Sequence, residues 1–585
     1  MRLKLKFLII PLIFIVLFSV SVLSETGKLL ILHTNDIHGV ISHSTAFWMN
    51  PSFPPPIGGA ASAVALIKNI REEAAREGYE VLVMDAGDIW QGTPVGDKTQ
   101  AMATIKYFEL AGYDVWALGN HDFDAGWEVA KMLTESSPMP VVCSNIIDTT
   151  TGAMPTWKNL YPYIIVERGD LKIGILGAIT DDMNTLVSED KLGPIRFPKV
   201  GLTIPKYIKE LREVEKVDLV IGLFHTGISY TKEEKYLVLK EWQKEADAKG
   251  LVYGTDEYTN FIYEKKGFGL QDHEIADLVP GLDVIVGGHS HSGLYPPWED
   301  PRNHTIVVQA YSKLSSIGQL ELTYDRNTKQ IVNYRADNFT LFSDEIPPDK
   351  ETDLIISEMV NDAESGMKIP IATSRTPITR GNDETLLGNL ITDAIKERFD
   401  MDVVLFNRGG MRADLPDGDI TEMDIYQVLP FGNSIVTMEV SGLLLKEILE
   451  VGVSGRRRDT QLAGVKLVYN PNFPEKERIT ELRINGEPLD LNKTYKFATS
   501  DYLAQGAVGY YMFAFVEEND FTGVTIRSSV IEYVKKHTPL DVKLEGRIRR
   551  NEKAQYSQEL IKLNEDVKSR ELEIKDARNL EMDYR

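Results

Sequence analysis

The chain contains 585 residues, of which 43% are hydrophobic and 26% charged, and its formal net charge is −23. This length exceeds what one hydrophobic core organises, so at least two domains are expected. The acidic balance excludes nucleic-acid polymers and anionic membranes as partners, because no net basic field attracts them. A small anionic substrate stays compatible with this charge, since a metal centre supplies its own local positive charge.

The first 24 residues have the pattern of an export signal. A basic start precedes an apolar core over residues 7–18, and a cleavage point follows at Ser24. The apolar stretch is shorter than the ~20 residues that a membrane span needs, so cleavage is favoured over an uncleaved anchor. Cys143 is the only cysteine, which rules out an intramolecular disulfide. We therefore predict a secreted, periplasmic or cell-surface protein.

After the signal, apolar strand-like runs alternate with helical stretches, including a helix over 60–77 that Gly78 closes, and this alternation predicts a layered α/β domain. A charged, Tyr-rich insertion over 229–269 either covers the site or decorates the surface. A second α/β block follows, and the last segment is a solvated helix or a disordered tail. The predicted boundaries are 25–340 for the first domain, 341–369 for a linker helix, 370–548 for the second domain and 549–585 for the tail.

Polar residues with metal-binding chemistry follow five of the apolar runs in the first domain. Buried strands that end in Gly and a ligand deliver their side chains to one sheet edge. A lone histidine there is more often a core or capping residue, but five of the ten histidines fall at such strand ends. Two divalent cations that share a bridging oxygen require this mixture of carboxylate, amide and imidazole. The candidate ligands are Asp36, His38, Asp88, Asn120, His225, His289 and His291.

The motifs at residues 34–39, 87–88, 119–124 and 287–291 resemble those of the calcineurin-like metallophosphoesterases. More narrowly, they resemble the exported 5′-nucleotidase family, which includes UDP-sugar hydrolases and 2′,3′-cyclic phosphodiesterases. The resemblance implies a four-layer α/β/β/α sandwich that carries two ions of Mn, Zn, Co or Fe, and a C-terminal α/β substrate domain. It implies one ion on Asp36, His38, Asp88 and His291, and another on Asp88, Asn120, His225 and His289.

The resemblance also implies a catalytic pair, His121 and Asp124. His121 would contact the phosphoryl group or the leaving oxygen, and Asp124 would fix its tautomer. The alternative role for Asp124 is that of a helix N-cap, because a helical stretch follows it.

In the second domain, the resemblance implies four substrate contacts. Arginine suits a phosphate or carboxylate group, although Asp414 or Asp417 offers Arg412 another partner. Aromatic rings in Gly-flanked loops suit stacking on a nucleobase, with core packing as the alternative. The chain departs from the family at Val508, where the family has a carboxylate for the ribose hydroxyls. The four candidate contacts are Asn407, Arg412, Phe431 and Tyr502.

We therefore predict an exported dinuclear-metal phosphohydrolase that removes phosphate from nucleotides, in the manner of a 5′-nucleotidase. UDP-sugar or 2′,3′-cyclic nucleotide phosphodiesterase activity is one alternative, and hydrolysis of sulfur conjugates is another. A surface-binding protein with a vestigial site is a third. The expected partner is a nucleotide, with no nucleic-acid polymer, no membrane beyond the export signal and no obligate protein partner.

Overall fold

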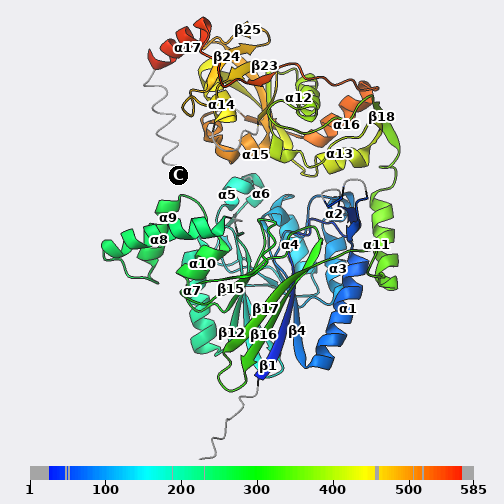
Figure 1. Ribbon diagram of the computed structural model, residues 1–585, viewed down its shortest axis with the longest axis vertical. Helices are drawn as coiled ribbons and strands as arrows, with labels where there is room; N and C mark the ends of the chain where they lie inside the picture. Colours follow the sequence, from blue (N-terminus) through cyan, green and yellow to red (C-terminus); the bar gives the residue numbers. More distant parts are fainter. Residues whose placement is uncertain are drawn as a thin grey trace, which may run out of the picture.

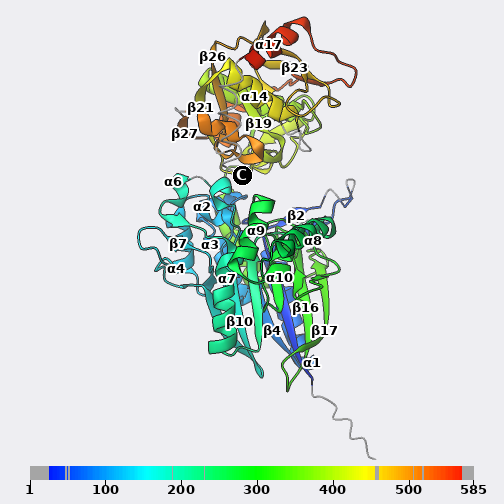
Figure 2. The same ribbon diagram turned by 90° about the vertical axis from the view of Figure 1, so that its left-hand side faces the viewer.

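The computed structural model describes residues 26–46, 49–50, 53–187, 189–228, 231–454, 460–504, 506–516 and 519–569. The predicted signal, 1–24, and the end of the predicted tail, 570–585, lie outside the described residues. The described chain forms two lobes stacked along the long axis (Figures 1 and 2). The first lobe comprises residues 26–363 and the second comprises residues 370–569. Within the described residues, no helix has the length and apolar character needed to cross a membrane.

Two β-sheets face each other in the first lobe. Side chains of β1 alternate, so that Leu29 and Ile31 pack between the sheets while Leu30 and Leu32 pack beneath the helices. One sheet has the order β17 (Ile331–Thr340), β16 (Ser316–Asp325), β1 (Thr26–Thr34), β4 (Tyr79–Asp85), β5 (Val115–Ala117), β6 (Val141–Val142) and β8 (Leu160–Tyr161). The other has the order β14 (Trp298–Glu299), β15 (Ile306–Val308), β13 (Val284–Gly287), β12 (Leu219–His225), β10 (Leu171–Ile179) and β9 (Tyr163–Arg168).

Helices cover the outer face of each sheet, which confirms the predicted four-layer α/β/β/α sandwich. The predicted helix over 60–77 forms as α1, and Gly78 ends it in the left-handed conformation. Helices α1 (Ala60–Glu77), α3 (Met102–Ala111), α4 (Trp127–Ser136) and α11 (Lys350–Ala363) cover the first sheet. Helices α7 (Val200–Lys209), α8 (Lys232–Ala248), α9 (Asp256–Lys266) and α10 (Asp272–Leu278) cover the second.

The insertion over 229–269 is helical in its described part, which forms α8 and α9. Leu239, Ala246 and Phe261 bury apolar side chains in the core of this helical layer. None of its described residues lines the large cavity between the lobes. The described part of the insertion therefore thickens the outer helical layer.

The second lobe is an α/β unit with a five-stranded and a four-stranded sheet. The larger sheet has the order β22 (Thr460–Ala463), β19 (Val403–Asn407), β26 (Thr494–Ser500), β21 (Ser434–Ser441) and β27 (Asn519–Thr525). The smaller has the order β25 (Glu487–Pro488), β24 (Ile479–Ile484), β23 (Val465–Tyr469) and β28 (Ile548–Arg550). The helices are α12 (Leu386–Phe399), α13 (Glu422–Val428), α14 (Gly442–Val453), α15 (Asp501–Ala504), α16 (Ile526–Lys536) and α17 (Gln558–Ser569).

The charged segment after residue 549 contributes to this lobe. Leu560 and Val567 of α17 are buried in the same core as β23 and β24. Apolar side chains at these two helical positions thus anchor a segment whose composition predicts only a solvated helix or a disordered tail.

Candidate active site

The seven candidate ligands meet at one edge of the first lobe. Strands β1, β4 and β5 run parallel in one sheet, and β12 and β13 run parallel in the other. Their carboxyl ends therefore reach the same edge, over which the second lobe lies (Figure 1). Asp36 and His38 follow β1, Asp88 follows β4, Asn120 begins the short helix η1 (Asn120–Phe123), His225 ends β12, and His289 and His291 follow β13.

Asp88 lies among the nitrogen atoms of this cluster. Its Oδ2 atom is 3.1 Å from Nε2 of His225 and 3.9 Å from Nε2 of His38. Asn120 Oδ1 is 3.2 Å from Nε2 of His225 and 2.8 Å from Nδ1 of His289. The side chains of Asp88 and His225 are almost completely buried. Asp88 therefore faces candidate ligands of both ions, as a bridging carboxylate must.

Asp36 lies on the other side of the cluster. Its Oδ1 atom is 3.4 Å from Nε2 of His291, which is 3.0 Å from Nε2 of His38. These three residues form one compact donor group, and Asp36, Asp88 and His225 form a second. The resemblance makes Asp88 the shared ligand, whereas the two donor groups share Asp36. Both carboxylates are central to the cluster.

Backbone hydrogen bonds orient two of the histidine rings. His38 Nδ1 faces the carbonyl of Gln91 at 3.1 Å, and His225 Nδ1 faces that of Ala86 at 2.7 Å. In both rings Nδ1 carries the proton and donates it, so Nε2 turns inward. Either a proton or a cation must then lie between His225 Nε2 and Asp88. Burial alone would lower the pKa of His225, but the Asp88 carboxylate raises it to about 10. The donor set thus concentrates negative charge and lone pairs, which fits divalent cations.

Backbone strain accumulates at these residues. Asp36, His38, Asp88, His289 and His291 all have φ between 52° and 75°, the left-handed region that side chains other than glycine rarely adopt. Such conformations cost on the order of 1–3 kcal/mol each and persist where the surroundings hold them in place. The clustering indicates a functional site.

Glycines make room for the ligand loops. A Cβ atom on Gly119 would lie 2.2 Å from Oδ1 of Asp88, and one on Gly288 would lie 2.9 Å from Nδ1 of His225. No larger residue fits at either position without moving a candidate ligand. The Gly-ligand pattern of the sequence thus has a steric cause.

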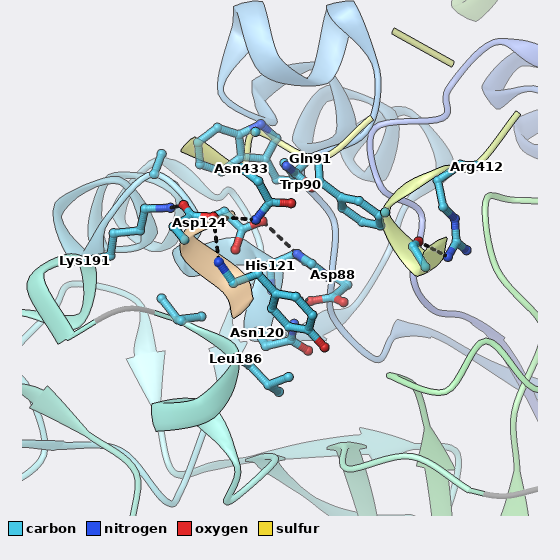
Figure 3. A pocket seen from close by; sticks show the side chains of 18 of the residues that line it. Asp88, Trp90, Gln91, Asn120, His121, Asp124, Leu186, Lys191, Arg412 and Asn433 are labelled. Carbon is cyan, nitrogen blue, oxygen red and sulfur yellow. Dashed lines mark hydrogen bonds and ion pairs between the residues drawn. The ribbon is translucent and has the colours of Figure 1, made fainter. Parts of the chain in front are cut away.

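The predicted catalytic pair is assembled beside the ligands. His121 Nδ1 lies 2.7 Å from Oδ2 of Asp124 (Figure 3). The backbone amide of His121 donates to Oδ1 of Asp88 at 2.8 Å. Burial would lower the pKa of His121, but Asp124 and then Asp88 raise it to about 9. The N-cap alternative for Asp124 is wrong, because Gly126 occupies the N-cap of α4. Since Nδ1 is engaged by Asp124, His121 presents Nε2 to the cavity.

A cavity of about 490 Å³ lies between the lobes and joins this cluster to the second lobe. All four candidate substrate residues line it, together with Val508. Phe431 and Tyr502 are half-buried at its wall, and the ring of Phe431 stacks on that of His121 with centroids 5.8 Å apart. Phe431 therefore contacts the predicted catalytic pair across the lobe boundary.

Arg412 also reaches the cavity. Its guanidinium lies 5.6 Å from the ring centroid of Phe431. The Asp414 alternative is wrong, because Asp414 pairs with Arg380 at 2.9 Å. Asn407, at the end of β19, is buried in the adjacent wall. The guanidinium of Arg412 and the side-chain amide of Asn407 thus line the same cavity as several candidate metal ligands.

Two family models match the chain in consecutive parts. Residues 29–293 match the calcineurin-like phosphoesterases, and residues 369–515 match the 5′-nucleotidase C-terminal domain. The chain thus combines a calcineurin-like phosphoesterase domain with a 5′-nucleotidase C-terminal domain. The protein UshA of Escherichia coli is 27% identical over 88% of this chain and 92% of its own length. A 5′-nucleotidase of Vibrio parahaemolyticus is 28% identical over 88% and 90%, respectively. The 5′-nucleotidase precursor of Thermus thermophilus has a TM-score of 0.70 at 25% identity, covering 89% of this chain and 99% of that one.

This pair of domains identifies the chain as a metal-dependent phosphoric ester hydrolase. Several residues that support its site escape sequence reasoning. Asp122 accepts hydrogen bonds from the amides of Ile89, Trp90 and Gly119 at 3.0, 3.2 and 2.8 Å, and so ties the Asp88 loop to the Asn120 loop. Its place beside His121 in the motif is a signal that could have identified it.

Other residues that line the cavity are harder to identify from the sequence. Asn433 donates to Asp501 at 2.8 Å, and Lys191 lies 3.8 Å from the same carboxylate across the lobe boundary (Figure 3). Lys191 belongs to α6 (Glu189–Leu192), which follows α5 (Met183–Leu186) below α15 (Figure 1). No pattern in the surrounding sequence marks Lys191, because its role depends on where the second lobe sits.

Metal removal is expected to destabilise the first lobe. A ligand at about 100 times its Kd stabilises the folded state by about 2.7 kcal/mol, which corresponds to roughly 4 °C for a domain of this size. Calorimetry of the chelator-treated protein with and without added Mn²⁺ would measure the shift. The Asp88→Asn variant should show a smaller shift, and equal unfolding temperatures with and without Mn²⁺ in the wild type would contradict the prediction.

Proposed function

We propose that the chain is an exported dinuclear-metal phosphohydrolase that releases phosphate from nucleotides as a 5′-nucleotidase. The observation that carries the proposal is one cavity in which the candidate ligands and the His121–Asp124 pair face Arg412, Phe431 and Tyr502 of the other lobe. Relatives named 5′-nucleotidases align over nearly the whole chain, which supports the same substrate class. Export is supported by the pattern of residues 1–24.

Two divalent ions drawn from Mn, Zn, Co or Fe complete the proposed site. When bound, they supply Lewis-acid polarisation of the phosphoryl oxygens. The proposed ligands are Asp36, His38, Asp88 and His291 for one ion, and Asp88, Asn120, His225 and His289 for the other.

The protein's own groups bind and orient the substrate. The Asp124 carboxylate raises the pKa of His121, which donates from Nε2 to the phosphoryl or leaving oxygen as charge develops. Asp124 fixes the ring in that orientation. Arg412 binds an anionic oxygen, and Phe431 and Tyr502 offer ring faces to the base.

Phosphate release by residues 25–585 with added Mn²⁺ tests the proposal. The substrates are AMP, ADP, UDP-glucose, 2′,3′-cyclic AMP and para-nitrophenyl phosphate, each run beside Asp88→Asn. Fast release from AMP that is lost in the variant is expected. Turnover of the nitrophenyl ester alone would show a live metal site with a different leaving group, such as a sulfur conjugate carrier. A wild type that binds no metal and hydrolyses none of them would favour a vestigial site.

Val508 makes the cavity unusual at the end where the sugar would lie. It is β-branched, yet has φ of 59° between Gly506 and Gly509, and its half-buried side chain lines the cavity. Aspartate tolerates this conformation better than valine and accepts hydrogen bonds from a diol. We expect Val508→Asp to raise the preference for AMP over 2′,3′-dideoxy-AMP about 10- to 100-fold in kcat/KM, because hydrogen bonds to charged groups contribute about 1.5–3 kcal/mol.

Val508→Asn is the matched control, since it has the same shape and tolerance of positive φ without the charge. It should change the preference less than Val508→Asp does. Equal preferences in wild type and Val508→Asp would show that this residue does not face the sugar.

A further inference from the structure

We propose that Arg527 is a positioning residue that holds Phe431 against His121 and, by binding Asp97, fixes the lobes in the arrangement that closes the cavity. The substrate readouts below rest on the proposed function. Arg527 lies in the first turn of α16 and is only 9% exposed. A buried guanidinium needs partners for its donors, and those of Arg527 lie in two different lobes.

The first set of partners belongs to the loop that carries Phe431. Arg527 Nε donates to the carbonyl of Leu429 at 2.8 Å, and Nη2 donates to that of Pro430 at 2.6 Å. These are the two residues before Phe431. Because the guanidinium is a rigid planar fork, it fixes both carbonyls together. The ring of Phe431 follows directly and stacks on His121 at an interplanar angle of 19°.

The remaining partner lies in the first lobe. Arg527 Nη1 is 3.3 Å from Oδ2 of Asp97, which also accepts a hydrogen bond from the Tyr426 hydroxyl at 2.7 Å. The guanidinium packs over the ring of Tyr426, 3.4 Å from its centroid. Tyr426 and Arg527 come from α13 and α16 of the second lobe. Asp97 is therefore held by a cation and a hydroxyl across the lobe boundary.

Asp97 is in turn connected to the metal-ligand loops. It lies in α2 (Pro94–Thr99), which follows Gln91, the residue whose carbonyl orients His38. Thr93, the N-cap of α2, donates to the carbonyl of Gly39 at 2.7 Å. Arg527 thus connects the ligand loop of one lobe to the aromatic loop of the other through short contacts. Displacing it should shift Phe431 relative to His121 without removing any candidate ligand.

Arg527→Lys tests the positioning role, because lysine keeps the charge but lacks the fork. In this test, kcat and KM of the wild type and the variant are measured for AMP and for ribose 5-phosphate, which lacks the base. The expected loss in kcat/KM is about 10- to 50-fold for AMP, mainly in KM, and less than about 3-fold for ribose 5-phosphate. Arg398→Lys is the matched control, since Arg398 forms a more exposed pair with Glu532 of α16 and should leave both substrates unaffected. Equal losses for both substrates would overturn the positioning role.

The contact with Asp97 is tested by combining Asp97→Asn with Arg527→Lys. If both act through one contact, the double variant should lose no more than the worse single variant, whereas independent residues would give multiplied losses. If the wild type hydrolyses ribose 5-phosphate but not AMP, the proposed function fails. The role of Arg527 in fixing the lobes is then tested by a distance measurement that does not depend on activity.

The distance between the lobes is measured with spin labels at Glu109→Cys and Lys466→Cys, one in each lobe, in a Cys143→Ser background. Both labelled positions are exposed. With the Arg527–Asp97 contact intact, the two labels should show one dominant distance. Asp97→Asn or Arg527→Lys should broaden the distribution of that distance or shift it to longer values. An unchanged distance distribution in both variants would overturn the role of Arg527 in fixing the lobes.

Discussion

Replacing Asp88 with Asn is expected to lower kcat for AMP on the order of 1,000-fold. The physical reason is charge. Oδ2 of Asp88 lies 3.1 Å from His225 and 3.9 Å from His38, so the carboxylate faces candidate ligands of both ions. An amide keeps the shape but removes the negative charge that would neutralise two cations. Phosphate release under saturating AMP measures the loss.

Metal content decides whether this loss has the expected cause. Elemental analysis of Asp88→Asn should show less than the wild-type amount of bound metal, because the proposed shared ligand is lost. Asp344→Asn, at an exposed position in the first lobe, is the matched control and should keep both activity and metal. Full activity in Asp88→Asn would show that Asp88 is not a required metal ligand.

Replacing His121 with Ala is expected to lower kcat for AMP by about 100- to 10,000-fold, the range over which a positioned proton donor acts. His121 contacts Asp124 at 2.7 Å and lies beside the ligand cluster, with its ring centroid 5.2 Å from that of His38. Because Asn120 and the other proposed ligands are untouched, bound metal should stay at the wild-type amount. Single-turnover phosphate release separates this chemical effect from binding.

Asp124→Asn should cause a smaller loss, since the ring of His121 stays but loses its charged partner. His304→Ala is the control, because His304 is an exposed histidine that pairs with Glu299. Loss of metal in His121→Ala would instead identify His121 as a ligand.

Local sequence pattern was sufficient to predict a layered α/β fold and to identify the candidate ligands. In β1 the period of two assigns Leu29 and Ile31 to one face and Leu30 and Leu32 to the other. The Gly-ligand dipeptides predict strand ends that meet at one edge, since parallel strands share their direction. Asp36 and His38 therefore lie near Asp88 in the structure, as their positions after β1 and β4 indicate.

Other features depend on side chains whose neighbours the pattern does not specify. The N-cap role considered for Asp124 failed because the N-cap of α4 lies two residues later, at Gly126, and leaves the Asp124 carboxylate to His121. The apolar positions of α17 are sparse among charges, so its anchoring on the second lobe depends on the surface that it meets. Helix starts and buried faces are decided by such competing contacts.

The sequence by itself determined the alternation of strands and helices, the strand ends and the residue types that converge on them, because these follow from periodicity and steric need within short segments. Only the tertiary structure decided how the two lobes form one cavity. Asp97 and Arg527 are 430 residues apart in the chain, and Phe431 reaches His121 from the other lobe. Contacts between such distant residues depend on how two separately packed cores dock, and no local pattern encodes that geometry.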